Sequence, residues 1–291
     1  MVQTVRIGVI GGSGLYAMPE LTPIETLAVD TPFGAPSSPV VIGELGGQRV
    51  AFLARHGHGH VYTPSTVPYR ANIHALKQLG VRKLIAVNAC GSLREDYAPG
   101  HVVIPDQLFD YTKDERGRSF FGPGLVAHVS VADPFCASLN QQAASAVRQA
   151  GGTAHEGGVY VTIEGPRFST RGESEIFRQL GCSIVGMTTC PEAFLAREAE
   201  MCYTTISHVT DYDVWHTSEA PVTVEMVMQT FHHNLRVAQQ AVANLVSTLD
   251  AEADCTCQHA LDHAIMTAPH AIDPAMIERL RPLVGRLYPT A

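Results

Sequence analysis

The stretch IVGMTTCPEAFLAREAEMCYTTISHVTDYD, from Ile184 to Asp213, decides the fold. Its first residues, Ile184–Met187, form a short apolar run that predicts a buried strand. The dipeptide Pro191-Glu192 then supplies helix-start signals, because proline suits the first helical position and glutamate the first turn. A helix over Ala193–Ala199 and a second strand over Cys202–Val209 complete a strand–turn–helix–strand unit.

Polar side chains follow both strands of this unit. Thr188 and Thr189 come after the first strand, and Asp211 and Asp213 come after the second. Ligands of open α/β sheets bind at the carboxyl ends of the strands. The hydroxyl cluster and the carboxylate cluster are therefore expected to face one crevice.

The rest of the chain alternates strands with helices. The segment 19–39 is rich in proline and is a poor crossover helix, and Thr112–Pro123 has the composition of a mobile loop. We predict one α/β domain over residues 1–250, with a central mixed sheet flanked by helices, and a helical extension of the same domain over residues 251–291. Strands are predicted at Val5–Ile10, Val50–Leu53, Lys83–Val87 and Gly157–Ile163, and helices at Tyr69–Leu79, Cys136–Gln149, Arg171–Leu180 and Val222–Leu249.

Composition narrows the classes of function. The chain has 291 residues, of which 45% are hydrophobic and 16% charged, and this is enough to bury a sizeable core. A net charge of −8 argues against a general binder of nucleic acid or of membrane surfaces. The start of the chain has no signal-peptide core and no apolar run is long enough to span a bilayer. We expect a cytoplasmic protein.

The seven cysteines are odd in number and scattered, which favours reduced thiols over a disulfide framework. Cys255 and Cys257 form the one close pair. A zinc site there would need two more ligands, for which His259 and His263 are the nearest candidates in the sequence. We favour an exposed or labile thiol pair in the C-terminal extension over a metal site.

Two loops after strands carry groups that suit an anion. The glycine-rich turn Gly11–Gly14 lets backbone amides approach a phosphate, and Ser13 adds a hydroxyl, although the spacing differs from a dinucleotide fingerprint. Arg55 and His56 follow another strand, and a guanidinium matches phosphate oxygens. The alternating histidines His56, His58 and His60 also suggest a metal site, but they would point the same way only in an extended strand, and the glycines between them favour a loop that binds phosphate.

The Asp211-x-Asp213 pair is suited to bind an amino group. If the two carboxylates lie close together, or one is shielded from water, the pKa of one rises and it can donate a proton to a ring nitrogen near pH 7. A solvated turn is the alternative interpretation of this pair alone. Phe168, beside a glycine-proline turn, is suited to stack on a flat heterocycle, although core packing is the commoner role of phenylalanine.

Seven collinear blocks of this sequence resemble the 5′-methylthioadenosine phosphorylases of the trimeric purine nucleoside phosphorylase family. The resemblance extends from about Ile7 to about Leu249, and seven blocks in order are highly specific. They are Val9–Leu15, Val29–Gly34, Ala54–Gly57, Ala89–Leu93, Thr162–Ser169, Met187–Glu192 and Thr210–Asp213.

The resemblance implies phosphorolysis of a purine nucleoside by a cytoplasmic homotrimer that uses phosphate as co-substrate and needs no metal or further cofactor. Asp211 and Asp213 would bind adenine N7 and the 6-amino group, with Asp211 as the acid. Met187 would contact the ribose, Phe168 and Ser169 would border the base, and one contact is expected to come from a neighbouring subunit. Phosphate would be held by Ser13, Arg55, His56, Asn88, Ala89 and Thr188, and the 5′-methylthio group by His60, His128, Val224, Val227 and Met228.

The two aspartates favour adenine over a 6-oxopurine, since ionised carboxylates only accept hydrogen bonds. Asn88 stands where relatives often have threonine, which bears on phosphate affinity. The alternatives are a phosphorylase for methylthioinosine or other 6-oxopurine nucleosides, a nucleoside hydrolase, and a dinucleotide-dependent oxidoreductase based on Gly11–Gly14.

Overall fold

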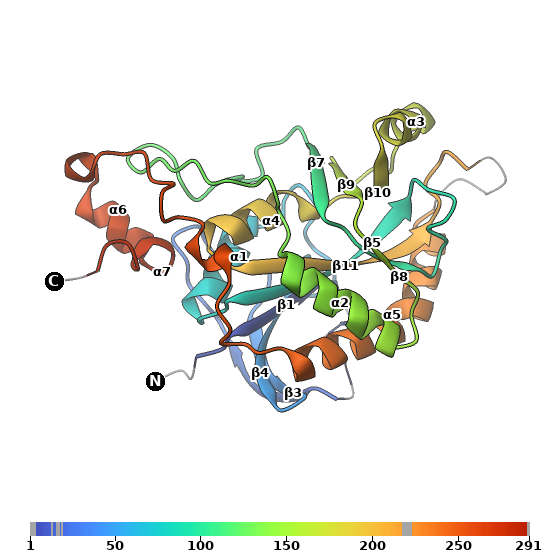
Figure 1. The fold of residues 1–291 in the computed structure, drawn as a ribbon, viewed down its shortest axis with the longest axis horizontal. Coiled ribbons are helices and arrows are strands. Elements are labelled where there is room, and N and C mark those ends of the chain that lie inside the picture. The colour runs from blue at the N-terminus through green and yellow to red at the C-terminus, as the bar shows by residue number, and fades with distance from the viewer. Residues whose placement is uncertain (1–3, 13, 16–17, 19, 217–222, 290–291) are drawn as a thin grey trace.

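A computed structural model gives one mixed sheet with helices on both faces (Figure 1). It describes residues 4–12, 14–15, 18, 20–216 and 223–289, and of residues 226, 227 and 229–234 it describes the backbone only. The strands are β1 (Ile7–Gly11), β2 (Thr22–Leu27), β3 (Val40–Leu45), β4 (Gln48–Ala54), β5 (Lys83–Ser92), β6 (Val102–Ile104), β7 (Gln107–Tyr111), β8 (Ala154–Glu156), β9 (Val159–Ile163), β10 (Cys182–Gly186) and β11 (Cys202–Asp211). The predicted mixed α/β sheet is confirmed.

Strand β5 is the hub of the sheet. It pairs in parallel with β1 and with β11, and its last residues pair antiparallel with β10. The main path of strands runs β2-β3-β4-β1-β5-β10-β9-β7, while β11 branches from β5 and continues through β6 to β8. Because β1, β4, β5 and β11 run the same way, the residues that follow them gather at one edge of the sheet.

Alternation along β5 shows how the two faces are covered. Leu84 and Ala86 belong to one hydrophobic cluster, whereas Ile85 and Val87 belong to another. The first cluster includes residues of α1 (Tyr69–Gln78) and α4 (Thr189–Glu198). The second includes residues of α2 (Ala137–Gln149) and α5 (Val224–Thr248), so helices protect both faces from water. The remaining helix of the main body, α3 (Arg171–Gln179), carries a capping box built by Thr170 and Glu173.

The hairpin β2–β3 was not predicted from the sequence. Segment 19–39 reads as proline-rich, yet Thr22–Leu27 pairs antiparallel with Val40–Leu45 at the end of the sheet. The side chains of β2 are mostly exposed, so the strand lacks the apolar alternation that marks a half-buried strand. Proline is tolerated on such an edge because no neighbouring strand needs its amide.

The chain after α5 passes the N-terminal end of α2 and continues to the end of the molecule opposite α3 (Figure 1). It contains the short 3₁₀ segments η1 (Thr256–His259) and η2 (Pro269–Ala271) and the helices α6 (Pro274–Arg279) and α7 (Arg281–Val284). Cys257 is buried and Cys255 is half-buried, so the expectation of an exposed thiol pair is wrong for Cys257. The domain division at residue 250 stays a prediction.

No helix in the described ranges combines the length and apolarity that crossing a bilayer requires.

Candidate active site

The carboxyl ends of the strands open into one cavity of about 570 Å³. Segments after β1, β4, β10 and β11 contribute to its wall, and so does the second half of β5. The expectation that hydroxyls after one strand and carboxylates after another face the same crevice is met by Thr188, Asp211 and Asp213, whereas Thr189 is buried and does not line the cavity. The predicted site residues that line it are Arg55, His56, His60, Asn88, Ala89, Phe168, Ser169, Met187, Thr188, Asp211, Asp213, Val224 and Met228.

Three predicted residues need separate mention. Ser13 lies outside the described residues, and for Val227 the side chain does. His128 does not line the cavity of its own chain. It is exposed, and its backbone amide donates to the carbonyl of Ala264 in the tail.

One end of the cavity holds the two aspartates, each less than a tenth exposed. Asp211 accepts a hydrogen bond from the Thr210 hydroxyl at 2.7 Å and another from the Asp213 backbone amide at 2.7 Å. Oδ2 of Asp213 is buried and has no hydrogen-bond partner among the described residues. The Ser169 hydroxyl, which also lines the cavity, is likewise buried without a hydrogen-bond partner among the described residues. A buried polar atom left unpaired is costly unless a ligand completes it.

Burial also changes the acidity of this pair. It raises the pKa of Asp211 to about 6, against the opposing effect of the hydrogen bonds from Thr210 and Asp213. Burial likewise raises the pKa of Asp213, against the lowering effect of the nearby Ser174 and Ser169 hydroxyls, neither of which makes a full hydrogen bond within the described residues. The negative charge of Asp213 adds a small further rise to the pKa of Asp211. A carboxyl with a pKa near 6 can both hold and release a proton at neutral pH.

Gly91 of β5 allows the aspartates to approach the sheet. A Cβ atom at this position would lie 3.0 Å from Oδ1 of Asp211 and 3.2 Å from Cβ of Asp213. The register between β5 and β11 also shifts between Val209 and Asp211, which marks a bulge. Bulges re-aim side chains next to functional sites, and this one lies where β11 enters the cavity.

The other end of the cavity holds a buried ion pair. Nε and Nη2 of Arg55 donate to the two carboxylate oxygens of Glu192 at 2.7 and 2.8 Å, and Nη1 donates to the Val87 carbonyl at 2.9 Å. The Tyr203 hydroxyl donates to Glu192 at 2.8 Å. Burial lowers the pKa of Arg55, but the charge and the hydrogen bonding of Glu192, with smaller contributions from Tyr203 and Tyr69, together raise it above its ordinary value, so the guanidinium stays charged.

The fork of Arg55 is therefore occupied by the protein itself. The sequence predicted that this fork would grip phosphate, but its two-pronged face is bound to Glu192. Sequence reasoning treated Glu192 as a helix-start signal and missed the pair, since 137 residues separate the partners. Arg55 still places its charge at the cavity wall. Its Nη1 carries two hydrogens, and only one of them is donated to the Val87 carbonyl.

His56 lies beside Arg55. Its Nδ1 is 2.9 Å from the Tyr62 carbonyl, which can only accept, so Nδ1 carries the hydrogen and Nε2 is the acceptor of the neutral ring. Burial, and then the charge of Arg55, lowers the pKa of His56 to about 4. The His60 ring stacks on it at 4.2 Å. His56 therefore offers a lone pair rather than a positive charge at neutral pH.

Two further groups complete this end. Nδ2 of Asn88 donates to the Thr205 hydroxyl at 2.9 Å and lies 3.3 Å from the Thr189 hydroxyl, while its Oδ1 is buried and unpartnered within the described chain. Thr188 precedes α4 and makes no capping hydrogen bond with its side chain. Both side chains line the cavity with hydrogen-bonding capacity to spare.

A hydrogen-bonded support behind Met187 was not predicted from the sequence. Arg116, at 8% exposure, donates to the Met187 carbonyl at 2.7 Å and to Glu164 at 3.0 Å from Nε. Glu164 also accepts from the backbone amides of Lys113 and Asp114. The loop Thr112–Pro123, which was expected to be mobile, is thus anchored by its own Arg116. The composition of a loop does not reveal such contacts.

The rim of the cavity is apolar. Val224 and Met228 at the start of α5 are 67% and 42% exposed although they border the cavity. Val61, next to His60, is 70% exposed. Large apolar side chains grouped around an opening are typical of a surface that a ligand or another chain covers.

Comparison with known proteins agrees with this architecture. The model of the phosphorylase superfamily matches residues 6–249. The chain belongs to the phosphorylase superfamily. It is 53% identical over 287 residues to an S-methyl-5′-thioadenosine phosphorylase of Chloroflexus aurantiacus, an alignment that covers 99% of this chain and 100% of the relative.

Solved structures of this superfamily share the fold. A methylthioadenosine phosphorylase from an Antarctic soil metagenomic library superposes with a TM-score of 0.91 at 46% identity, covering 96% of this chain and 99% of the other. A methylthioadenosine phosphorylase of Schistosoma mansoni in complex with adenine gives 0.83 at 37% identity, covering 89% and 96%. The resemblance inferred from the seven sequence blocks is confirmed at the level of family and fold.

Proposed function

We propose that the protein catalyses phosphorolysis of S-methyl-5′-thioadenosine to adenine and 5-methylthioribose 1-phosphate. The observation that carries the proposal is the buried, unpartnered Oδ2 of Asp213 beside Asp211, in the same cavity as Arg55. The relative from Chloroflexus aurantiacus bears the name of this activity, and the alignment spans nearly the whole of both chains.

The carboxylate pair binds the base in this proposal. The 6-amino group of adenine donates to Oδ2 of Asp213, which relieves the cost of burying that oxygen unpaired. Asp211, with its raised pKa, gives a proton to N7 as the glycosidic bond breaks. Phe168 and Ser169 border the ring, and the Ser169 hydroxyl has bonding capacity left for it.

The opposite end binds phosphate. Arg55 supplies a fixed positive charge and its remaining Nη1 hydrogen, while Nε2 of His56 accepts from a protonated phosphate oxygen. Thr188 offers its hydroxyl, and Ser13 and the backbone amide of Ala89 are assigned by resemblance. Asn88 can donate if its amide turns over, because the Thr205 hydroxyl can then donate to Oδ1.

The sugar and its 5′ substituent lie between these ends. Met187, whose carbonyl is fixed by Arg116, borders the ribose. The apolar rim residues Val224 and Met228, together with His60, accommodate the methylthio group, and Val227 is assigned to the same group by resemblance only. An apolar rim of this kind favours a thioether over the free hydroxyl of adenosine.

The chemistry follows from the separation of the two ends. Phosphate attacks C1′ while the C1′–N9 bond breaks, so positive charge develops on the sugar and negative charge on the purine. One phosphate oxygen forms the new C1′–O bond, and Asp211 neutralises the departing purine by protonating N7. The residues at one end thus hold the nucleophile, and those at the other end neutralise the leaving group, on opposite sides of C1′.

We further propose that the working form is a cytoplasmic homotrimer in which a neighbouring subunit covers the rim. The exposure of Val224 and Met228 supports a covering chain, and the position of His128 outside its own cavity supports a role in a neighbour's cavity. Light scattering should give about three times the chain mass of 31.3 kDa. A monomer with full activity would contradict this assembly.

The test of the activity is adenine release from methylthioadenosine with and without phosphate. We expect release to require phosphate and to yield the sugar 1-phosphate in equal amount. Release at the same rate without phosphate would instead establish a hydrolase. A faster reaction of methylthioinosine would favour the 6-oxopurine alternative, and NAD-dependent turnover would favour an oxidoreductase.

A further inference from the structure

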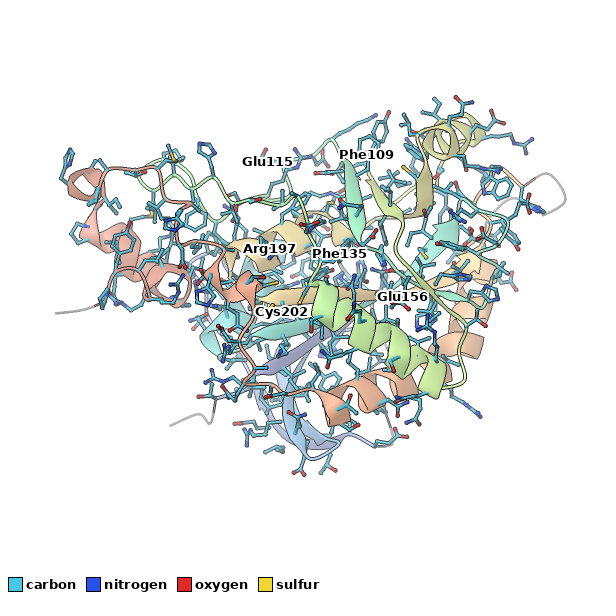
Figure 2. All side chains as sticks on the ribbon, in the orientation of Figure 1. Phe109, Glu115, Phe135, Glu156, Arg197 and Cys202 are labelled. Atoms are coloured by element: carbon cyan, nitrogen blue, oxygen red, sulfur yellow. The ribbon has the colours of Figure 1, made fainter. Side chains whose placement is uncertain are left out.

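The tail after α5 returns to the main body at four cysteines, which we call the four-cysteine cluster: Cys136, Cys202, Cys255 and Cys257. Their sulfur atoms all lie within 4.8 Å of one another, and those of Cys136 and Cys255 are 3.7 Å apart. None of the four lines the active-site cavity. In Figure 2, Cys202 lies beside the N-terminal end of α2, with Arg197 near it.

Each sulfur is positioned by a fixed piece of backbone. Cys136 is the residue before α2, and its amide donates to the Tyr203 carbonyl at 2.9 Å. Cys202 opens β11, with its amide bonded to the Arg82 carbonyl. Cys255 and Cys257 flank Thr256 at the start of η1. The cluster therefore joins the helix α2 and the strand β11 to the tail.

The arrangement has the dimensions of a tetrahedral thiolate site. With zinc–sulfur bonds of about 2.3 Å, the sulfurs at two corners of a tetrahedron lie about 3.8 Å apart. The Cys136–Cys255 distance of 3.7 Å already has this value, and the other sulfurs need contract by only about 1 Å at most. Cys136, Cys202 and Cys257 are buried, so solvent has little access to compete for a fifth position.

The position of Cys136 also suits a thiolate ligand. It is the residue before α2, so its sulfur lies near the positive end of that helix, which favours the deprotonated form that a metal ion requires.

We propose that the four-cysteine cluster is a structural site for a soft divalent cation with tetrahedral preference, Zn²⁺ being the probe of choice. Four S–H groups lose four protons, four sulfur–zinc bonds form, and the site has a net charge of −2 with no change in oxidation state. All four positions are filled by protein, which is typical of structural rather than catalytic sites. The ion would fasten residues 255 and 257 of the tail to the phosphorylase body.

This site differs from the one weighed in the sequence. The ligands missing beside Cys255 and Cys257 were sought at His259 and His263, which are near in the chain. The structure instead brings Cys136 and Cys202 to the pair, from positions 119 and 53 residues before Cys255. Ligands contributed by distant segments cannot be recognised from spacing alone.

The experiment is the metal content of the full-length protein, purified under reducing conditions without a metal-affinity step. We expect about one zinc per chain, released when an organomercurial titrates the thiols. Replacement by Co²⁺ should give the visible absorption of tetrahedral cobalt bound to thiolates. Cys255→Ser, at the half-buried position, should lose most of the zinc while phosphorolysis continues, because the cluster lies outside the cavity.

Cys182→Ser is the matched control, since Cys182 is a buried cysteine outside the cluster. It should retain zinc as the unaltered chain does. Metal-free protein with seven titratable thiols would overturn the proposal. So would an intact mass showing that the cluster cysteines have lost their hydrogens to disulfides, or zinc that persists undiminished in Cys255→Ser.

Discussion

The two ends of the active-site cavity treat buried charge in opposite ways. At one end Arg55 and Glu192 satisfy each other through two hydrogen bonds, with Tyr203 completing the carboxylate. At the other end Asp211 and Asp213 are equally buried, yet an oxygen of Asp213 has no partner in the described chain. The first arrangement stabilises the protein, whereas the second is complete only when a ligand is bound.

The difference indicates how one wall can hold both an anion and a leaving group. A paired guanidinium keeps its charge and position without needing phosphate to hold it in place. The two aspartates have raised pKa values because no positive charge among the described residues faces them and their hydrogen bonds offset the effect of burial only in part. The end prepared for phosphate is therefore rigid and charged, and the end prepared for the base is able to exchange a proton.

The largest expected effect is on catalysis at the end of the cavity that holds Asp211 and Asp213, which we call the open end. Asp211→Asn removes the proton donor while preserving size, so kcat/KM for methylthioadenosine should fall about 10²- to 10⁴-fold. The KM for phosphate should change little, because Arg55 and His56 are untouched. Steady-state kinetics with both substrates varied measures this. Asp250→Asn, at an exposed position far from the cavity, is the control, and equal activity of the two variants would remove Asp211 from the mechanism.

The next effect is on stability at the end that holds the Arg55–Glu192 pair, which we call the closed end. Glu192→Gln leaves the Arg55 charge buried without its counter-charge, and the free energy of unfolding should fall by about 3–5 kcal/mol. Denaturant unfolding followed by circular dichroism measures it. Glu278→Gln breaks the exposed pair with Arg281 and should cause no measurable change. A loss at position 192 as small as at position 278 would mean that the buried pair is not needed for folding.

The open end should show the opposite response of stability. The pKa of Asp211 rises from 3.8 to about 6 on folding, so its burial destabilises the fold above pH 6 and this cost disappears below about pH 4. Asp211→Asn should therefore raise the free energy of unfolding by about 1–3 kcal/mol at pH 8 and leave it nearly unchanged at pH 4. Thermal or urea unfolding at the two pH values tests this. A variant less stable at pH 8 would show that the carboxylate is satisfied within the protein.

The smallest effect is the pH dependence of turnover. If Asp211 acts as the acid, kcat/KM of the unaltered protein should decline about tenfold per pH unit above an apparent pKa near 6. Phosphate ionises in the same range, so the profile of Asp211→Asn serves as the reference for that contribution. The limb assigned to Asp211 should be absent from the variant. Superimposable profiles would assign the proton donor elsewhere.

The sequence predicted the frame of the site well and its internal pairing poorly. Apolar runs followed by polar residues mark the strand ends, and this pattern predicts that Arg55, Thr188 and Asp211 lie at one edge of the sheet, where the structure has them. Local patterns contain this information because the side-chain period and the helix-start signals depend on near neighbours.

Pairing across the fold was not predictable in the same way. Glu192 lies in a helix-start motif that explains it adequately, and nothing local reveals that its partner is Arg55. Arg116 stands in a polar loop, and the four-cysteine cluster draws on three separate segments. His128 was assigned to the cavity by resemblance, and its own chain does not bring it there.

The most direct test is how the residue at position 213 determines which purine base the enzyme prefers. The ratio of kcat/KM for methylthioadenosine to that for methylthioinosine should be measured in the unaltered protein and in Asp213→Asn. Asparagine tolerates the backbone of this residue, whose φ is +51°, and its amide can donate to a 6-carbonyl. The account predicts that the ratio strongly favours the aminopurine and falls at least about a hundredfold in the variant. An unchanged ratio would contradict it, because the open carboxylate would then not be what recognises the base.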